Sequence, residues 1–427
     1  MTPTPEQIQQ VWSEGRILPL AGPAPHDQQA LQQAIGSGGL DWLAPRWGPG
    51  VVLGSGGSSG ADGSSSGGGR RWCLQPLAHL EASAAATGQW LQRCGLDPGA
   101  CVHLNGLPLH HVSGLLPLVR CWQWGALHLR LEPAWLRQPA RLAALPLPPQ
   151  RPLLLALVPT QLHRLLAQPD GLAWLQRLAL IWVGGAPLGA ELAERARRAG
   201  LRLAPCYGAT ETAAMVCALP PERFLAGDGG CGPPLADVRL RIAPGSAAVE
   251  LDCGRLSPGW LAAGRLQPLP RSADGWWRSG DGGRLEPAGL QVLGRLDGAL
   301  HSGGETVFPE QLEQRLQQSA RQEGLPLRWV LLLARDDPEW GQRLEALVCP
   351  SAEAGGEGQR RQLLTRLAGI CSGWAPAERP RRWHLCPQLA PSPLGKWERC
   401  RWRAWLDRLE AHQHCTGTGG DGQSLRD

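Results

Sequence analysis

Lys396 is the single lysine of a chain in which lysine and arginine together number 42. It stands in the segment PSPLGKWERC, residues 391–400. Arginine has a flat guanidinium that is always charged, whereas lysine is a compact charge on a flexible stem that can reach one oxygen in a narrow site. A biased base composition of the gene explains the many arginines. It does not explain the one lysine, which is present either by chance or because its chemistry is needed. If chemistry keeps it, we expect Lys396 to meet a small, concentrated negative charge.

A glycine- and serine-rich segment follows the apolar residues 51–53. Residues 54–60 read GSGGSSG, and the backbone N–H and hydroxyl groups of such a loop after a strand can bind phosphate oxygens. It is not a Walker loop, because no Gly-Lys-Ser/Thr follows. Glycine and serine continue to residue 69, so a flexible low-complexity linker is the alternative interpretation.

Residues 206–212 read CYGATET and contain the only tyrosine, Tyr207. Upstream, LALIWVGGAPL at 178–188 is typical of a buried strand that opens into a Gly-Gly-Ala-Pro turn. Thr210 and Glu211 would then lie at the carboxyl edge of a sheet, where open α/β sheets bind ligands. Glu211 could hold Mg²⁺ and Thr210 a phosphate oxygen. The structural alternative is a helix N-terminus, with a threonine cap and the glutamate in the first turn.

Asp281 and Arg295 are the charged residues of interest in the stretch 276–305. Asp281 lies in a Ser-Gly-Asp-Gly turn, where a carboxylate suits a pair of ribose hydroxyls. Arg295 follows an expected strand and could reach the same sugar or a phosphate. Taken singly, a turn aspartate and a surface arginine are the simpler interpretations.

The elements that must position these residues follow from the apolar pattern. Between residues 100 and 290, apolar runs alternate with helical stretches, which predicts strand–helix–strand units and a parallel sheet. Residues 232–296 differ, because their short alternating segments predict a small β region. Beyond them we expect a smaller set of elements, namely a helix at 309–323, strands at 328–336 and 343–350, and a helix at 358–372.

We therefore predict an α/β fold with two domains. The N-terminal domain, residues 1–296, is large and has parallel sheets and the small β region. The C-terminal domain, residues 297–412, is a smaller, mobile α+β domain, and residues 413–427 form a disordered tail. A length of 427 residues also favours more than one domain.

Composition excludes several classes of protein. With 43% hydrophobic and 19% charged residues and a formal charge of +5, the chain is typical of soluble globular proteins, and no basic stripe predicts nucleic-acid binding. No secretory signal is visible, and the apolar runs are too short to cross a bilayer. The 13 cysteines are scattered without a CxxC pair, which argues against structural zinc and favours free thiols in a reducing, cytoplasmic compartment.

Taken in order, the motifs resemble the adenylate-forming acyl-CoA synthetase (ANL) superfamily over residues 50 to about 400. They are the Gly/Ser loop, LPLHHVSGL (107–115), GGAPL (184–188), YGATET (207–212), GCGPPL (230–235), SGD (279–281), GRLDGALHSGGETVFPEQLE (294–313) and PLGK (393–396). The block at 294–313 and YGATET are the most specific. LPLHHVSGL, GGAPL and SGGETVFPEQLE look most like the o-succinylbenzoate–CoA ligases of menaquinone and phylloquinone synthesis.

The resemblance implies an N-terminal ATP site. Its residues would be Ser55, Ser58, Ser59 and Gly60 at the β- and γ-phosphates, Gly184, Gly185 and Ala186 beside the adenine, Tyr207 stacked on it next to Gly208, Thr210 at a phosphate, Glu211 at Mg²⁺, and Asp281 at the ribose with Arg295 close by. The family usually continues the Gly/Ser loop into Pro-Lys-Gly. Here that lysine is missing, so either Arg70 or Arg71 replaces it or the loop holds pyrophosphate weakly.

The resemblance also implies catalytic roles. Lys396 would bridge the substrate carboxylate and the α-phosphate, and His111 would line the acyl pocket near that carboxylate. Asp297 would be the hinge of the mobile domain. In the second step the pantetheine tunnel would be lined by Gly303, Gly304 and Glu305.

The activity implied is that of a carboxylate–CoA ligase that forms an acyl-adenylate, with ATP, Mg²⁺ and coenzyme A as cofactors. Its partner is a small carboxylic acid, without nucleic acid or a membrane span, and a homodimer is one option for its assembly. For o-succinylbenzoate, Arg120 or His111 could meet the carboxylate that is not activated. The alternatives are another acyl- or aryl-CoA synthetase, an enzyme that loads a carrier protein, and a non-catalytic nucleotide-binding homologue.

Overall fold

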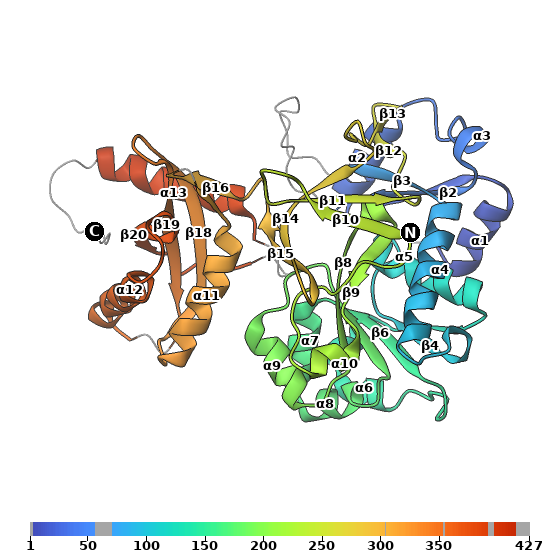
Figure 1. Cartoon of the computed structure of the whole chain (residues 1–427), viewed down its shortest axis with the longest axis horizontal. Helices are drawn as coiled ribbons and strands as arrows, with labels where there is room; N and C mark the ends of the chain where they lie inside the picture. Colours follow the sequence, from blue (N-terminus) through green and yellow to red (C-terminus); the bar gives the residue numbers. More distant parts are fainter. Residues whose placement is uncertain (1–2, 56–70, 304, 353–354, 392–396, 416–427) are drawn as a thin grey trace. The chain divides into compact units, whose positions relative to one another are not determined.

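A computed structural model describes residues 3–55, 71–303, 305–352, 355–391 and 397–415 (Figure 1). The chain divides into two compact units. Unit 1 consists of Met1–Ser279 and Gly283–Val292, and unit 2 of Gly280–Gly282 and Leu293–Asp427. No helix in the described part of the chain combines the length and the apolarity needed to cross a membrane.

The main sheet of unit 1 has six strands in the order β5-β4-β6-β7-β8-β9. These strands are β4 (Val102–Asn105), β5 (Leu127–Arg130), β6 (Leu153–Leu157), β7 (Leu180–Val183), β8 (Leu203–Ala209) and β9 (Ala214–Ala218). The pairings from β5 to β8 are parallel, and β9 returns antiparallel to β8. The predicted parallel sheet is confirmed.

Both faces of this sheet are buried, which explains its continuous apolar runs. On one face, Leu155 and Ile181 share an apolar cluster with helices α7 (Pro159–Leu166), α8 (Pro169–Leu175) and α9 (Ala190–Arg198). On the other face, Leu154, Leu180 and Trp182 pack in a cluster with α4 (Leu77–Arg93). Successive side chains of a strand therefore pack in opposite cores.

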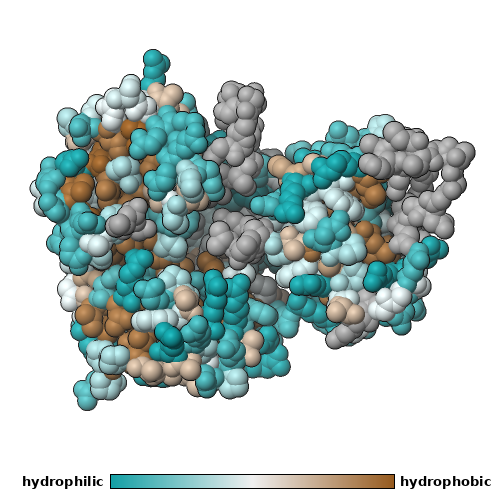
Figure 2. Space-filling model, turned by 180° about the vertical axis from the view of Figure 1, so that it is seen from behind, coloured by the Kyte–Doolittle hydropathy of each residue, from teal (hydrophilic) through white to brown (hydrophobic). Residues whose placement is uncertain are grey.

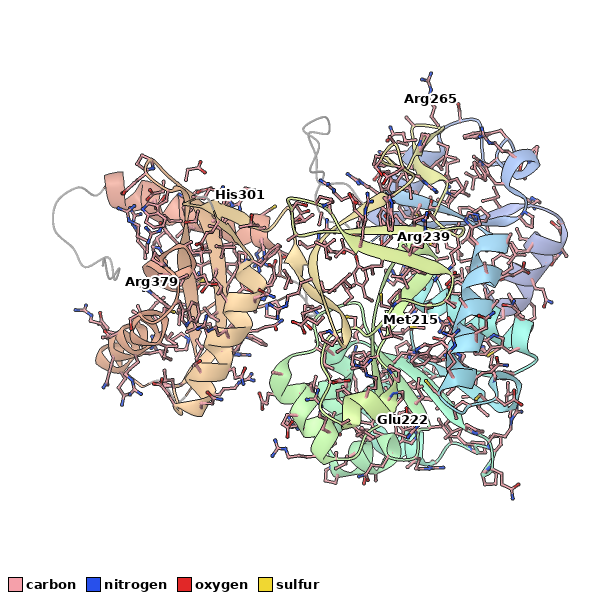
Figure 3. All side chains as sticks on the ribbon, in the orientation of Figure 1. Met215, Glu222, Arg239, Arg265, His301 and Arg379 are labelled. Atoms are coloured by element: carbon pink, nitrogen blue, oxygen red, sulfur yellow. The ribbon has the colours of Figure 1, made fainter. Side chains whose placement is uncertain are left out.

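The second sheet of unit 1 runs β1-β2-β3-β12-β13. It contains β1 (Ile17–Leu20), β2 (Gly50–Gly54), β3 (Trp72–Pro76), β12 (Gly259–Ala262) and β13 (Arg265–Pro268). Because β2 and β3 are antiparallel neighbours, the Gly/Ser loop is the connection between them. Met215 of β9 points into the interior of unit 1, whereas Arg265 projects from the β12–β13 hairpin (Figure 3).

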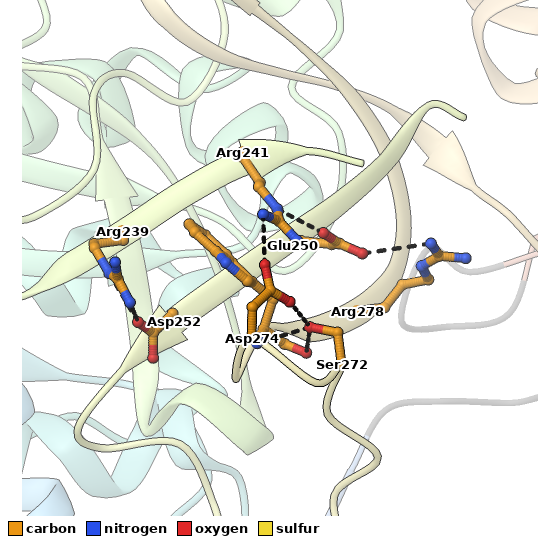
Figure 4. A network of polar contacts seen from close by, with 8 residues as sticks. Arg239, Arg241, Glu250, Asp252, Ser272, Asp274 and Arg278 are labelled. Atoms are coloured by element: carbon orange, nitrogen blue, oxygen red, sulfur yellow. Dashed lines mark hydrogen bonds and ion pairs between the residues drawn. The ribbon is translucent and has the colours of Figure 1, made fainter. Parts of the chain in front are cut away.

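The predicted small β region is the sheet β10-β11-β14-β15, formed by β10 (Val238–Ile242), β11 (Ala248–Cys253), β14 (Trp277–Glu286) and β15 (Gly289–Arg295). Cross-strand ion pairs stabilise it (Figure 4). Arg241 lies opposite Glu250 in the register and binds it at 2.8 Å, and Arg239 is paired in the same way with Asp252. Opposite charges in directly facing positions favour this register over a shifted one.

Unit 2 contains the sheet β17-β16-β19-β18, with β20 paired to β19. Its strands are β16 (Leu300–Ser302), β17 (Glu305–Val307), β18 (Leu327–Asp337), β19 (Gly341–Pro350) and β20 (Pro380–Leu385). Helices α11 (Pro309–Gln322) and α12 (Glu357–Cys371) pack on one face, and α13 (Arg399–Cys415) packs on the other. The helices and strands predicted between 309 and 372 are present. Helix α13 continues to Cys415, past the expected start of the tail, and residues 416–427 lie outside the described residues.

The remaining helices of unit 1 are short or peripheral, apart from α5. They are α1 (Pro5–Ser13), α2 (Pro25–Ile35), α3 (Ala44–Trp47), α5 (Val112–Trp124), α6 (Pro139–Ala143) and α10 (Pro221–Leu225).

Seen from behind, the surface carries apolar side chains interspersed with polar ones (Figure 2). Every cysteine with a described side chain is a free thiol.

Candidate functional site

The turn after β8 carries the candidate phosphate and metal residues. Thr210–Thr212 form a single 3-10 turn, which is followed by Ala213 at φ 50° and by Ala214, the first residue of β9, at φ 75°. The alternative of a threonine-capped helix is therefore wrong: Ala209 occupies the cap position and the chain turns back as a strand. Left-handed alanines end the helical turn before a second turn can form.

Glu211 is held at this edge by the second sheet of unit 1. Its side chain is buried, and its Oε1 accepts a hydrogen bond from Trp260 Nε1 at 2.9 Å. Within the described residues, no donor is bonded to its other oxygen. The backbone is fixed as well, because Ser257 N donates to Glu211 O at 2.7 Å and Gln75 Nε2 donates to Thr210 O at 2.6 Å. One carboxylate oxygen is thus oriented and the other is left for a ligand.

The base of the Gly/Ser loop lies next to Glu211. Ser55 N donates to Arg71 O at 2.7 Å and closes the base, and the Arg71 guanidinium lies 4.5 Å from the centre of the Trp260 ring. Trp260 is the residue that binds Glu211, so one indole joins the loop to the candidate metal ligand. Ser55 Oγ is buried with no partner among the described residues. The other loop positions expected to bind phosphate, Ser58, Ser59 and Gly60, lie outside the described residues.

The residues expected around adenine come together at the ends of β7 and β8. Gly184 follows β7, and a Cβ there would lie 2.9 Å from Cys206 Sγ, so β8 passes directly beside it. Gly185 has φ 77°, and Ala186 is exposed. Half-buried Tyr207 follows Cys206. Gly208 is required next, because a Cβ would lie 2.1 Å from Ala214 O across the hairpin.

His111 occupies the N-cap of α5, with its ring centre 4.4 Å from that of His110. Leu109 and Val112, on either side of the two histidines, pack in the same apolar cluster as Ala213. The segment that carries His111 therefore shares an apolar core with the turn that carries Glu211.

Arg120 and His103 form a buried polar spot inside unit 1. Arg120 of α5 is 5% exposed, lies 5.1 Å from the Trp182 ring centre, and is paired with no carboxylate among the described residues. Burial lowers its pKa to about 10. His103 of β4 is stacked 5.4 Å from Trp182, and neither of its ring nitrogens has a partner among the described residues. Burial, assisted by the charge of Arg120, lowers the pKa of His103 well below its ordinary value, so the ring is neutral.

Sequence reasoning missed His103 entirely. The only indication was a histidine inside the apolar strand that precedes LPLHHVSGL. The residues around it come from separate segments, with Trp124 of α5 stacked 6.4 Å away and Trp182 on β7.

In unit 2, Asp281, Arg295 and Asp297 form one network. Arg295 lies 3.4 Å from Asp281 and 3.0 Å from Asp297. The two carboxylates outweigh burial and raise the pKa of the guanidinium above its ordinary value. The expected ribose ligand, its arginine neighbour and the expected hinge are therefore linked to one another.

The β16–β17 hairpin carries the residues expected at the pantetheine tunnel. Gly303 has φ 57°, and its N donates to Trp340 O at 3.0 Å. A Cβ at Gly303 would come within 2.7 Å of the Trp340 ring, so only glycine fits. Glu305 is exposed on β17. Gly304 and Lys396 lie outside the described residues.

The donor set fits Mg²⁺ bound together with a nucleotide. In the part of the chain that the structure describes, no three His, Cys, Asp or Glu side chains are grouped to hold a metal. Mg²⁺ characteristically takes one or two carboxylates and completes its shell with phosphates and water. A single oriented carboxylate beside the buried hydroxyl of Ser55, which has no partner among the described residues, matches that mode.

Comparison with known proteins agrees with this geometry. Residues 76–251, which span α4 to β11, match the family described as AMP-binding enzyme. This segment of the chain is thus similar to AMP-binding enzyme domains. Its relatives include the 2-succinylbenzoate–CoA ligases of Salmonella typhimurium, 30% identical over 66% of this chain and 55% of that protein, and of Enterococcus faecalis, 27% identical over 76% and 65%. The chain thus spans less than two thirds of the length of these relatives.

Solved structures resemble this chain along most of its length. E. coli MenE with a bound phenylether-linked analogue of OSB-AMS is 26% identical, with a TM-score of 0.60 over 84% of this chain and 69% of that one. The o-succinylbenzoate CoA synthetase of Bacillus subtilis in complex with AMP is 19% identical, with a TM-score of 0.65 over 94% and 81%. The predicted α/β fold and the resemblance to adenylate-forming enzymes are confirmed.

Proposed function

We propose that this protein is an ATP-dependent ligase that joins o-succinylbenzoate to coenzyme A through an acyl-adenylate. The observation that carries the proposal is the convergence of the loop base, Glu211 and the adenine-side residues at one edge of the main sheet. This edge is where open α/β sheets bind nucleotides. The relatives named 2-succinylbenzoate–CoA ligase support the choice of acid.

In the first half-reaction, a carboxylate oxygen attacks the α-phosphorus of ATP and pyrophosphate leaves. Thr210 and the loop beginning at Ser55 bind the phosphates, and Tyr207 stacks on the adenine. Glu211 holds Mg²⁺, which when bound neutralises charge on the phosphate oxygens. Trp260 keeps the Glu211 carboxylate in one orientation while the phosphates change geometry.

Lys396 supplies a positive charge where the carboxylate oxygen meets phosphorus. A preorganised cation at that point stabilises the charge that develops in the transition state. We assign Lys396 to a mobile domain, residues 297–412, that turns about Asp297 after adenylation and withdraws the lysine. The CoA thiol then enters beside Gly303, Gly304 and Glu305 and displaces AMP.

The buried guanidinium of Arg120 supports a dicarboxylic substrate. An unpaired charge in a core is costly unless a counter-charge arrives. o-Succinylbenzoate has two carboxylates, and only one of them is activated. The other would pair with Arg120, while His111 lies on the same helix, at its N-cap.

Pyrophosphate release with a panel of acids tests the proposal. We expect o-succinylbenzoate to give AMP and pyrophosphate far faster than benzoate, a fatty acid or the half-ester that blocks one carboxylate. A preference for a monocarboxylic acid would shift the assignment to another acyl- or aryl-CoA ligase. Failure to form AMP with any acid would overturn it in favour of a non-catalytic homologue.

The acceptor is tested separately. Supplied acyl-AMP should react with coenzyme A and not with a phosphopantetheinylated carrier protein; the reverse result would indicate a carrier-loading enzyme. We assign the reaction to the cytoplasm, and light scattering would test the homodimer.

A further inference from the structure

The turn after Glu211 is held in a costly backbone conformation. Among the described residues, only three non-glycine residues have positive φ, and two of them, Ala213 and Ala214, follow Thr212 directly. Left-handed backbone is unfavourable for any residue with a Cβ, and consecutive examples persist only where surrounding contacts enforce them. Something in unit 1 must therefore hold this turn.

Side chains bind every carbonyl of the turn from residue 212 to residue 215. Ser83 Oγ donates to Ala213 O at 2.6 Å, and Thr212 Oγ1 donates to Ala214 O at 2.6 Å. Arg255 binds the carbonyls on either side, with Nη1 on Thr212 O and Nη2 on Met215 O. Four successive carbonyls are thus fixed by side chains, two of them by one guanidinium.

Arg255 is an unusual residue for a purely structural task. Its side chain is fully buried, and its only carboxylate partner among the described residues is Asp237, at 2.6 Å from Nε. The fork of a guanidinium can bind two carbonyls at a fixed spacing, which no apolar side chain can do. Two residues later, Ser257 N donates to Glu211 O. The segment 255–257 therefore holds both Glu211 and the strained turn behind it.

We propose that Arg255 and Ser83 are positioning residues that hold the 212–215 turn and thereby fix the Glu211 carboxylate for its metal. This inference rests on the proposed role of Glu211. We expect the turn formed by Thr210, Glu211 and Thr212 to be held rigidly. Gln75 of β3 and the backbone of Ser257 bind its carbonyls at Thr210 and Glu211. Ser83 of α4 and Arg255 bind the carbonyls of the turn that follows.

Ser83→Ala is the principal test, and Thr87→Val is its matched control. Both positions are fully buried on α4, but Thr87 Oγ1 bonds only to Ser83 O within the helix. The measurement is the calorimetric affinity for ATP with Mg²⁺ and with EDTA. We expect Ser83→Ala to reduce the Mg²⁺-dependent gain in affinity about fivefold, the size expected for one lost hydrogen bond. Affinity for metal-free ATP and the thermal midpoint should match those of Thr87→Val.

Arg255→Lys extends the test, because a lysine keeps the charge but cannot span two carbonyls. We expect it to lose more of the Mg²⁺-dependent gain than Ser83→Ala does. If Arg255→Lys does not fold, Ser83→Ala still decides the matter. Equal loss of affinity for ATP with and without metal would overturn the inference, because it would indicate general loosening of the fold.

Glu211→Gln separates this inference from the proposed function. If Glu211→Gln abolishes the Mg²⁺-dependent gain but Ser83→Ala behaves like Thr87→Val, the inference fails while the role of Glu211 stands. If wild-type protein gains nothing from Mg²⁺, the metal role of Glu211 fails and the inference fails with it.

Discussion

Arg120 is the residue at which we expect binding and stability to conflict. Its guanidinium is buried against Trp182, and no carboxylate among the described residues balances its charge. Replacing a buried, uncompensated charge with an apolar side chain of similar size commonly stabilises a protein. Residues at functional sites are often kept despite such a cost.

Arg120→Met should therefore be more stable and less active. We expect the free energy of unfolding to rise by about 1 kcal/mol or more. The KM for o-succinylbenzoate should rise by roughly 30-fold, as for a lost hydrogen-bonded ion pair. Urea unfolding and steady-state kinetics measure the two effects, with the KM for ATP as the control. A destabilised variant with normal affinity for the acid would show that Arg120 is structural.

Lys396→Ala should separate the two half-reactions. Loss of one preorganised donor lowers adenylation by about a hundred- to a thousand-fold, whereas CoA transfer from supplied acyl-AMP should be kept. Lys396→Arg, which retains the charge on a longer planar group, is the control and should remain slow in adenylation. If both half-reactions fell equally, Lys396 would have another role.

At the scale of elements, β4 and β5 place a buried histidine beside a half-buried one. His103 and His128 are register partners on these parallel strands. Burial lowers the pKa of both, His103 well below its ordinary value and His128 to about 4, assisted by Arg120 and Arg130 respectively. Both rings are therefore neutral in the folded protein at neutral pH.

Acid should consequently destabilise unit 1. A histidine in the unfolded chain has a pKa near 6.5, which is above the pKa of both histidines in the folded protein. Their contribution to the free energy of unfolding is therefore complete above pH 6.5 and is lost as the pH falls towards 4. The loss is at most about 1.4 kcal/mol per pH unit for each histidine, and it is smaller for His128, which is only partly buried. Urea unfolding between pH 4.5 and 7 should show a shallower slope for His128→Gln. An unchanged slope would contradict the assignment.

The strands of the main sheet could be predicted from the sequence, because a strand that is buried on both faces must be a continuous apolar run. The runs at 153–158 and 178–185 had to be buried strands, since both faces of the central sheet are covered by helices. The carboxyl-edge position of Glu211 followed from the same rule. The form of its turn did not, because a helix cap and a 3-10 turn with two left-handed alanines begin with the same residues.

Contacts between distant segments account for the remainder of the site. Ser83 reaches Ala213 across 130 residues, and Trp260 reaches Glu211 across 49. No local pattern specifies such pairs. The resemblance to adenylate-forming enzymes named the candidate site residues, but it did not predict Arg255, whose role appears only when the carbonyls of the 212–215 turn are traced.

For the whole molecule, the question is how one chain performs two half-reactions. We propose a rotation of the C-terminal domain about Asp297, and Arg295 is bound to both Asp297 and Asp281. Through Arg295, Asp281, which we expect to contact the ribose, is thereby connected to Asp297, whose backbone we expect to move. Such motions often limit turnover.

Asp297→Pro tests the hinge, because proline fixes φ and removes the backbone N–H. If the hinge must change φ between the half-reactions, adenylation should be largely retained, while CoA transfer should fall by on the order of tenfold or more. Asp297→Ala is the matched control: it removes both contacts with Arg295 but leaves the backbone free, so CoA transfer should stay near wild type. Single-turnover assays of each half-reaction provide the comparison. Equal loss in the proline and alanine variants would assign the effect to the ion pair with Arg295, and the hinge would then have to lie elsewhere in the chain.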